Sequence, residues 1–507
     1  MAIRVRQAAG VSAVTAPATM RDHIDAAEAM GELRRVTAEV SADLEITEIT
    51  DRVSKAGAGA NLGLFFERVR GHDMPVATNL FGSERRMALA LGASSLEEVG
   101  ERLAALISPE LPRGVRAVAS RLRGAMEAAG AFPKRVERAP SQRIVLRGDD
   151  VKLTRLPILR CWPEDGGRYI TLPLVITRDP VTGVRNVGMY RVQEYDDRTA
   201  GMHWQIHKGG AEQMERAGTR RIPVCVAIGG EPAVTYAASA PLPPGIDELL
   251  FAGWLMRRRA RIVRAVTCDL DVPAEADVVL EGWVDPGERR TEGPFGDHTG
   301  YYSLADEYPV LHVEAITMRD DAVWPATIVG RPPMEDYWLG HATERIFLPL
   351  LRMVQPEIVD YHMPAQGVFH NCVIVSMRKR YPGHAAKVMF AVWSTMQLST
   401  AKCVVVVDAD IDPHDLDEVA FRALSNVDPR RDTVIVDGAL DVLDHGGPGF
   451  ARGSKIGIDA TRKGRLDGYA REWPPDIVMD PRIVALVDRR WREYGLDALR
   501  PAARGES

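Results

Sequence analysis

The sequence predicts an α/β protein of several domains, with an N-terminal α/β segment, a barrel-like middle domain of short strands, and a C-terminal βαβ domain. Three observations support this class. With 507 residues, the chain is too long for a single hydrophobic core. From about residue 144, short strand-like runs are separated by Gly, Pro and Asp turns. From about residue 354, strand-like and helical runs alternate, which is typical of βαβ units.

The N-terminal part is predicted to be a tail followed by a small domain. Residues 1–19 lack the apolar region of a signal peptide, so we expect a flexible tail. Apolar residues recur at helical spacing over 20–36, where Gly31 is a late breaker. Further helices are predicted over 44–53 and 95–107, and strands over 62–69 and 74–80. The α/β domain should therefore cover 20–110, and a basic, Ala-rich linking segment should cover 111–143.

The middle domain is predicted to extend over residues 144–330 and to consist mainly of short strands. The clearest strand patterns are 171–178, 187–193, 223–228, 262–266 and 276–282. Two helical insertions are expected, over 211–217 and 246–257. Such a series of strands favours a barrel-like sheet over a flat one.

The C-terminal part begins with an interdomain linker over residues 331–353, in which we expect a helix over 342–353. A domain over 354–507 should follow. Its predicted strands are 373–377, 403–408 and 433–436, and its predicted helices are 385–396 and 416–424. A last helix is expected over 480–494, with Asp480 as N-cap and Pro481 at its first position.

Composition and charge exclude several functional classes. The chain has a net charge of −6 and no strongly basic block, which argues against a nucleic-acid-binding protein. No apolar run is long enough to span a bilayer. Five scattered cysteines without CxxC spacing indicate free thiols and a reducing compartment. We therefore expect a cytoplasmic protein.

Two stretches carry the chemistry of the chain. Residues 292–302 contain Glu292 and Asp297 around a turn rich in Gly and Pro, and residues 186–193 contain Arg191. In a regular helix or strand, acids five residues apart would point to different faces, but the turn lets the backbone fold back and bring both carboxylates together. Such a group could handle protons, although two acids in a solvated turn are also common.

These stretches, with several others, are similar to the signature of the UbiD family of reversible decarboxylases, which use prenylated FMN. The similar segments are 167–171, 179–183, 186–193, 203–210, 247–253, 292–302, 330–333, 381–387, Lys402 and 453–461. Their order and spacing fit the family over roughly residues 20–495. One such motif would be weak evidence, but so many in sequence make chance agreement implausible.

The resemblance implies a split β-barrel that binds prenylated FMN and a C-terminal domain that makes a dimer contact. It also implies a divalent cation, Mn²⁺ or Mg²⁺, that bridges to the cofactor phosphate. Asn186, His207 and Glu248 would be its ligands, since a carbonyl oxygen, an imidazole and a carboxylate suit these ions. A monovalent cation, K⁺, is typical of the family. The cofactor contacts implied by position are Asn186, Met189, Tyr190, Arg191, His203, Trp204, Gln205, Lys208, Gly209, Glu248 and Lys402.

The resemblance further assigns catalysis to Arg191, Glu292 and Asp297. Loss of CO₂ from an unsaturated carbon needs an electron sink that no side chain offers, so the cofactor would supply it. Arg191 would orient the substrate carboxylate, and two adjacent carboxylates should push one pKa up, which would make Asp297 the proton donor. The substrate would be an aromatic, heteroaromatic or α,β-unsaturated acid. His298 and Arg331 mildly favour a polar aromatic or heteroaromatic one.

Three alternatives remain open from the residues. An FMN-dependent reductase could also use a split barrel, but it needs no cluster of Arg and acids. A non-catalytic accessory subunit of a carboxylase complex would show degraded acids, whereas every catalytic and metal position is filled here. A hydrolase with a metal on His203, His207 and Glu248 lacks an obvious base. As partners we expect the acid substrate, a flavin prenyltransferase that supplies the cofactor, and a second copy of this chain in a homodimer or higher homo-oligomer.

Overall fold

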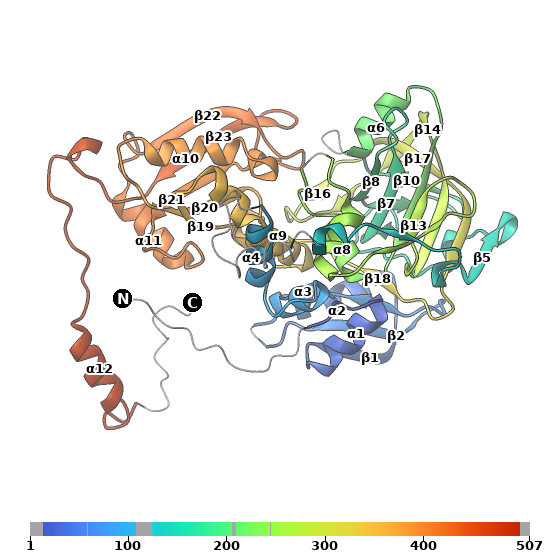
Figure 1. Ribbon diagram of the computed structural model, residues 1–507, viewed down its shortest axis with the longest axis horizontal. Helices are drawn as coiled ribbons and strands as arrows, with labels where there is room; N and C mark the ends of the chain where they lie inside the picture. The colour runs from blue at the N-terminus through green and yellow to red at the C-terminus, as the bar shows by residue number, and fades with distance from the viewer. Residues whose placement is uncertain are drawn as a thin grey trace. The chain divides into compact units, whose positions relative to one another are not determined.

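The computed structural model describes residues 14–57, 59–107, 124, 126–204, 209–243 and 245–496. Contacts between Cα atoms divide the chain into two compact units, residues 1–353 and 354–507 (Figure 1). Mixed helices and sheets fill both units, so the predicted multidomain α/β class is confirmed. None of the described helices is long and apolar enough to cross a membrane.

The N-terminal part of the first unit is a four-stranded sheet in the order β1-β2-β3-β18, flanked by helices (Figure 1). Its elements are α1 (Met20–Ala29), β1 (Leu33–Val40), α2 (Glu45–Ser54), β2 (Gly63–Val69), β3 (Val76–Thr78), α3 (Glu84–Ala90), α4 (Leu96–Ile107) and β18 (Trp324–Ala326). The periodic segment 20–36 is not one helix, because Gly31 adopts a φ of +74° and Leu33 already pairs with Gly63 of β2. Long-range strand pairing here overrides the local helical pattern.

Parts of the predicted tail and linking segment lie outside the described residues, namely 1–13, 108–123 and 125. Of the tail, Ala16 is buried, and the Pro17 carbonyl accepts a hydrogen bond from Arg258 Nη2 at 2.9 Å. Of the linking segment, β4 (Lys134–Arg135) pairs with β12 (Arg261–Arg264). These described parts are thus in contact with the first unit.

The centre of the first unit is a nine-stranded sheet. Its path is β6-β9-β10-β17-β14-β11-β7-β8, and β5 also pairs with β17. These strands are β5 (Ile144–Arg147), β6 (Tyr169–Ile170), β7 (Pro173–Arg178), β8 (Arg185–Met189), β9 (Val192–Glu194), β10 (Thr199–Met202), β11 (Ile222–Ile228), β14 (Val278–Glu292) and β17 (Asp306–Met318). Among the described residues β6 and β8 are edge strands, so the hydrogen bonding does not close a barrel.

The predicted strand 187–193 is two strands, and this break shapes the sheet. β8 lies at one end of the strand order and β9 near the other, yet only Tyr190 and Arg191 join them. Three Cα–Cα steps span at most about 11 Å, so the sheet must curl until its two ends are neighbours. The barrel-like curvature follows from this link, and Arg191 lies where the two ends meet.

The remaining elements of the first unit surround this sheet. They are α6 (Gly209–Ala217), α7 (Pro232–Ala237), α8 (Glu248–Met256), β13 (Asp271–Pro273), β15 (Phe295–Gly296), β16 (Tyr302–Ser303) and α9 (Glu335–Val354), together with β4 and β12. Two predicted boundaries were wrong. β14 continues ten residues beyond the predicted end at 282, because it pairs with β17 as far as Glu292. α9 begins at Glu335 rather than at 342, with Glu335 and Asp336 in its first turn.

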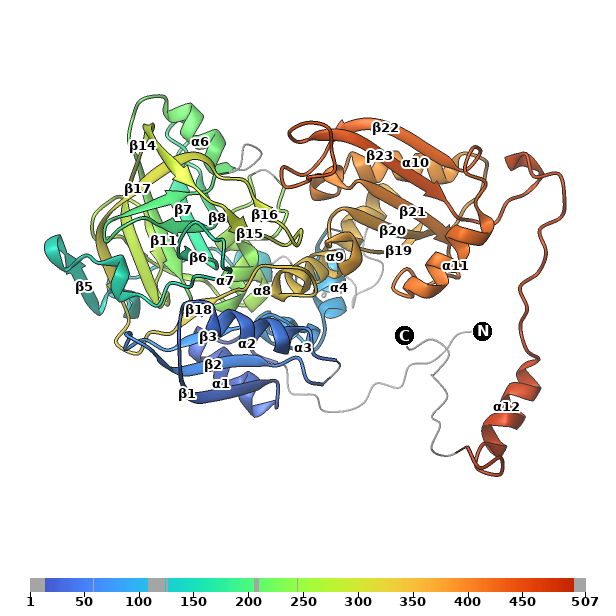
Figure 2. The same ribbon diagram turned by 180° about the vertical axis from the view of Figure 1, so that it is seen from behind.

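The second unit is a five-stranded sheet in the order β19-β20-β21-β23-β22 (Figure 2). Its elements are β19 (Ile358–His362), β20 (Cys372–Met377), α10 (His384–Trp393), β21 (Cys403–Asp408), α11 (Leu416–Asn426), β22 (Thr433–Ala439), β23 (Arg452–Asp459) and α12 (Pro481–Arg490). β20, α10 and β21 form the predicted βαβ arrangement, because β20 and β21 are parallel. No residue of α12 is buried in this chain.

Candidate active site

A buried arginine joins two carboxylates at the meeting point of the sheet ends. Arg191 donates from Nε to Glu292 Oε1 at 2.7 Å, from Nη2 to Glu292 Oε2 at 3.0 Å and from Nη1 to Asp297 Oδ2 at 2.9 Å. Nη2 also donates to Ser303 Oγ at 3.0 Å, and the guanidinium lies 4.6 Å from the centre of the Phe295 ring. The side chains of Arg191, Glu292 and Asp297 are at most 8% exposed. The structure thus brings together all three residues that were predicted to be catalytic.

The loop from Glu292 to Asp297 is held by contacts from distant segments. The backbone N–H of Gly293 donates to Gln193 Oε1 at 2.9 Å, and that of Gly296 donates to Asp165 Oδ1 at 2.8 Å. The other oxygen of Asp165 accepts from the backbone of Cys161 and Trp162 at 3.1 and 2.9 Å. Asp165 was not predicted from the sequence, because its position in a polar turn shortly before the predicted strand at 171 is too weak a signal to distinguish it.

Gly296 is the point of closest packing in this loop. A Cβ there would lie 2.1 Å from Cδ1 of Trp162, and Trp162 is held by a 2.7 Å hydrogen bond from Nε1 to the Val329 carbonyl. We expect Gly296→Ala to lower the free energy of unfolding by about 1–3 kcal/mol through overpacking and to displace Asp297. Chemical denaturation measures this loss. Gly287→Ala is the matched control, since the nearest atom to its new Cβ lies at 3.4 Å, and an equal loss in both variants would contradict the argument.

His203 lies on the other side of Glu292. Its Nδ1 is 3.0 Å from Glu292 Oε2, and its ring packs on Tyr308 with 4.3 Å between centres. Burial lowers the pKa of His203, so the ring is neutral at pH 7. A carboxylate only accepts, so Nδ1 carries the proton and the buried Nε2 is an acceptor without a partner among the described residues. His203, which was predicted from the sequence to line the cofactor site, thus contacts one of the acids that were predicted to be catalytic.

The electrostatics correct one expectation. Adjacent carboxylates were expected to raise one pKa, but Arg191 lies between Glu292 and Asp297 and stabilises both charges. Burial opposes ionisation of Glu292, yet hydrogen bonds from His203 and Arg191 and the charge of Arg191 outweigh it and lower its pKa to about 2. Burial also opposes ionisation of Asp297, but the charge and hydrogen bonds of His298, with Arg191, hold its pKa well below its usual range. Neither acid is poised near neutrality.

This depression of the pKa predicts an acid-sensitive contribution to stability. The pKa of Glu292 falls from 4.5 to about 2 on folding. Its ionisation therefore stabilises the fold by about 3 kcal/mol above pH 4.5, and this term is lost as the pH falls towards 2. We expect Glu292→Gln to destabilise the protein at pH 7 more than at pH 3 in denaturant titrations. The exposed Glu307→Gln should show no such difference, and a pH-independent effect of Glu292→Gln would contradict the assignment.

Two predicted metal ligands lie side by side. Asn186 is on β8 and Glu248 begins α8, and Glu248 Oε2 accepts a hydrogen bond from the Val187 backbone at 3.2 Å. Arg185 Nη2 lies 2.7 Å from Asp247 Oδ2, while Asp247 Oδ1 caps α8. This ion pair fixes the start of the helix against β8. The third predicted ligand, His207, lies outside the described residues.

The chemistry of this pair suits a cation. Burial, with the charge of Asp247, raises the pKa of Glu248 to about 7. A carboxylate whose charge is poorly compensated is stabilised by a bound divalent ion, and an amide oxygen from Asn186 is a further hard ligand. The residues present therefore fit the implied metal.

The predicted cofactor contacts are partly described. Met189 and Tyr190 precede Arg191 at the end of β8, and Trp204 follows His203 after β10. The buried Nε1 of Trp204, like Nε2 of His203, has no partner among the described residues, as expected where a polar ligand binds. Gly209 begins α6, whereas Gln205 and Lys208 lie outside the described residues. Lys402 belongs to the second unit, where its Nζ lies 2.5 Å from Asp444 Oδ2.

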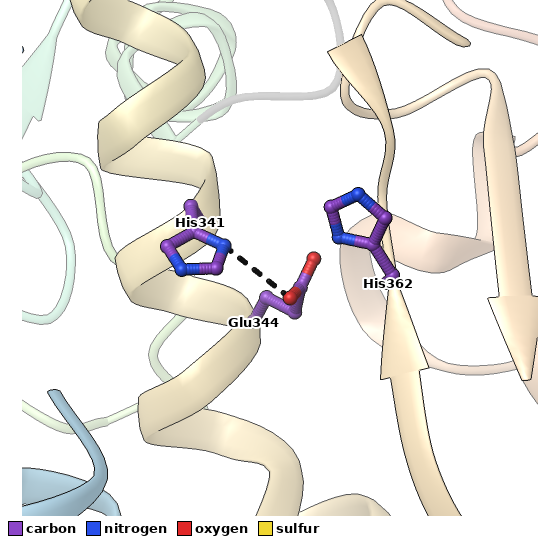
Figure 3. A group of neighbouring side chains, drawn as sticks. All are labelled: His341, Glu344 and His362. Atoms are coloured by element: carbon purple, nitrogen blue, oxygen red, sulfur yellow. Dashed lines mark ion pairs between the residues drawn. The ribbon is translucent and has the colours of Figure 1, made fainter. Parts of the chain in front are cut away.

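A second titratable pair lies on α9 and was not singled out from the sequence. His341 Nδ1 is 3.4 Å from Glu344 Oε1 (Figure 3). Arg345 Nη2 is 2.9 Å from the same oxygen. His362, also drawn there, belongs to residues 354–507. The i, i+3 spacing places His341 beside Glu344 on the helix, and the guanidinium of Arg345 compensates the charge of this buried acid.

Fold and site together define a carboxy-lyase. Residues 24–103, 134–332 and 337–460 match the N-terminal, Rift-related and C-terminal domains of the 3-octaprenyl-4-hydroxybenzoate carboxy-lyase family. The chain belongs to this family, which is the UbiD family. Uncharacterized proteins from Archaeoglobus fulgidus and Aquifex aeolicus are 50% and 48% identical over 480 and 481 residues. These alignments cover 94% of this chain and 98% and 99% of the relatives.

Solved structures of UbiD-class enzymes are similar over nearly the whole chain. HmfF from Pelotomaculum thermopropionicum, in complex with FMN, is 30% identical with a TM-score of 0.77, covering 93% of this chain and 99% of that one. Vanillic acid decarboxylase from Sedimentibacter hydroxybenzoicus is 28% identical with a TM-score of 0.81, covering 96% and 99%. These similarities agree with the family assignment.

Proposed function

We propose that this protein catalyses reversible, non-oxidative decarboxylation of an aromatic, heteroaromatic or α,β-unsaturated carboxylic acid with prenylated FMN. The observation that carries the proposal is the buried cluster of Arg191, Glu292 and Asp297 in a chain of the UbiD family. The bound cofactor would supply the electron sink that carbon–carbon cleavage requires. Complexes of the similar enzyme HmfF with FMN and with prenylated FMN support this choice of cofactor.

The roles of the three residues follow from their hydrogen bonds. The described contacts occupy four of the five N–H groups of Arg191, which leaves one on Nη1 to meet a substrate carboxylate beside Asp297. Glu292 holds the guanidinium in a two-point contact and so fixes its direction. Asp297 is the proposed proton donor to the carbon that CO₂ leaves. A bound substrate would cover the cluster and exclude water from it, which would strengthen the electrostatic interactions there.

The chain's own residues would hold the cofactor and its metal. Asn186, His207 and Glu248 would bind Mn²⁺ or Mg²⁺ against the cofactor phosphate, with Lys402 as a further phosphate contact. Nε1 of Trp204 and Nε2 of His203 have no hydrogen-bond partner within the described ranges, and they would meet polar groups of the bound molecules. A K⁺ ion would be a second, monovalent metal ion bound with the cofactor. A flavin prenyltransferase would have to supply the cofactor.

We also propose that the chain forms a homodimer or higher homo-oligomer through residues 354–507. Several large apolar side chains of this unit are exposed in the single chain, among them Leu424 at 87% and Ile435 at 69%. Burial of such side chains against a second copy would remove apolar area from water. Analytical ultracentrifugation measures the state, and a monomer at micromolar concentration would contradict it.

The test of the proposed function is the identity of the bound cofactor and the reaction it supports. The protein is co-expressed with a flavin prenyltransferase, and the released cofactor is weighed by mass spectrometry. A mass one five-carbon prenyl unit above FMN, with CO₂ release from a panel of unsaturated and aromatic acids, is expected. Plain FMN with hydride chemistry would favour a reductase, and cofactor-free, inactive protein would favour an accessory subunit.

Glu248→Gln separates cofactor binding from catalysis. We expect this variant to lose the divalent metal and the flavin together, because the neutral amide no longer compensates the cation's charge. Metal analysis and the flavin absorbance of the purified protein measure the loss. The exposed Glu137→Gln is the control and should keep both. Full metal and flavin content in Glu248→Gln would remove Glu248 from the proposed ligands.

A further inference from the structure

The ionised state of Asp297 leaves open where the proton for the product is held. A general acid must carry a proton before it can give one. The pKa of Asp297 lies well below its usual range, and that of Glu292 is about 2, so both acids are anions at neutral pH. Some other group close to Asp297 must therefore supply the proton.

His298 has the geometry for this supply. Its Nδ1 lies 2.7 Å from Asp297 Oδ1, and its backbone N–H donates to the same oxygen at 2.8 Å. Since an ionised carboxylate only accepts, the ring nitrogen is the donor. The other oxygen of Asp297 accepts from Arg191, so the two oxygens are divided between a permanent cation and an imidazole. The side chain of His298 is only 18% exposed.

A third acid lies near this pair. Asp336 is in the first turn of α9, and its charge and those of His298 and Asp297 act on one another. Burial, with the charge of Asp297, raises the pKa of Asp336 to about 6, although the charge of His298 works to lower it. Its neighbour Glu335 accepts a hydrogen bond from the backbone N–H of Phe81 at 2.7 Å, which holds the first turn of α9 against the segment after β3. In this group of acids, Asp336 rather than Glu292 or Asp297 is thus the one whose pKa lies closest to neutrality.

The charges around His298 favour its protonated form. Asp297 Oδ1 lies 2.7 Å from the ring, and the charge of Asp336 also acts on it. Nearby negative charges stabilise an imidazolium. Arg191 opposes this effect, but its charge is shared by Glu292 and Asp297.

We propose that His298 stores the transferable proton on Nδ1 and delivers it through Asp297, while Asp336 stabilises the protonated ring. His298 then acts through the proton donor and is a positioning residue for it. The inference rests on the proposed decarboxylation and adds the source of its proton. In the reverse direction His298 would take up the proton that Asp297 removes from the substrate.

The step balances within the site. The Nδ1–H bond of His298 breaks as an O–H bond forms on Asp297, and the ring becomes neutral. That O–H bond then breaks as a C–H bond forms with the electron pair that CO₂ leaves on the substrate. Asp297 returns to its anion, and a proton from solvent restores the ring. No oxidant or reductant takes part.

The first test measures the proton without any need for turnover. ¹⁵N-histidine NMR of the purified full-length protein reports the charge of each imidazole, and His298→Gln identifies the signal. We expect imidazolium shifts for His298 at pH 7, and neutral-ring shifts at the same pH after Asp336→Asn. His312→Gln is the matched control, because His312 Nε2 also lies 2.7 Å from a carboxylate, that of Glu288, on the protein surface. A neutral His298 ring at pH 6 in wild-type protein would overturn the proposal.

The second test uses the enzyme loaded with cofactor. His298→Gln should keep its flavin and melting temperature but release CO₂ about 100-fold more slowly, with kcat affected rather than KM. Added imidazole should restore part of the rate to His298→Ala, which a merely structural role would not allow. His312→Gln should behave as wild type. An unchanged kcat in His298→Gln would overturn the inference about His298. A wild-type enzyme that is inactive on every acid tested would instead contradict the proposed decarboxylation. In that case the NMR result would still decide the protonation state of His298.

Discussion

Arg191→Ala is expected to lower CO₂ release about 1000-fold and the free energy of unfolding by about 3–5 kcal/mol. The guanidinium is the partner of two buried carboxylates, and removal of one member of such a group leaves buried charges uncompensated. The substrate carboxylate would lose its proposed contact as well. Arg191→Lys should recover only part of both losses, because an ammonium cannot reproduce the two-point contact with Glu292.

The measurements are denaturant unfolding and CO₂ release, with Arg290→Ala as the control. Arg290 lies on β14, the strand that ends with Glu292, but its side chain is 46% exposed and its ion pair with Asp196 measures 3.5 Å. Such a surface pair contributes at most about 1 kcal/mol. Equal losses in both variants, or an active Arg191→Ala, would show that the buried cluster is not the site.

Asp297→Asn is expected to reduce turnover about 1000-fold while the cofactor stays bound. The amide keeps the volume of the acid but cannot pass on a proton. It would also lose the charge that holds the imidazole of His298, so the NMR signal of His298 should move towards the neutral ring. Near wild-type decarboxylation in this variant would contradict the role of Asp297.

Asp306→Asn is the matched control for this change. Asp306 is the register partner of Glu292 across β14 and β17, yet its side chain is exposed. It therefore has the same local strand environment without the buried contacts. Unchanged CO₂ release and flavin content in Asp306→Asn would assign the loss in Asp297→Asn to the cluster.

Much of the site could be predicted because its residues lie in two short stretches with recognisable motifs. Arg191, Glu292 and Asp297 were proposed as a unit, and the structure places them within hydrogen-bonding distance. The supporting residues were missed. Asp165 binds the backbone of Gly296 from 131 positions away, and Asp336 lies in the first turn of a helix whose start was expected seven residues later. Such contacts have no periodicity or spacing in the sequence.

Local sequence determined the α/β class, most helices and strands, and the identity of the chemical groups. Apolar periodicity and turn residues act over a few positions, so they can be recognised in the sequence before the tertiary structure is known. Only the tertiary structure decided that 187–193 breaks at Arg191 and that the ends of the sheet meet there. It also decided the protonation states, because a pKa depends on burial and on charges from distant segments. For this reason Glu292 and Asp297 are both ionised, although one of them was expected to hold a proton. We propose instead that His298 holds the proton.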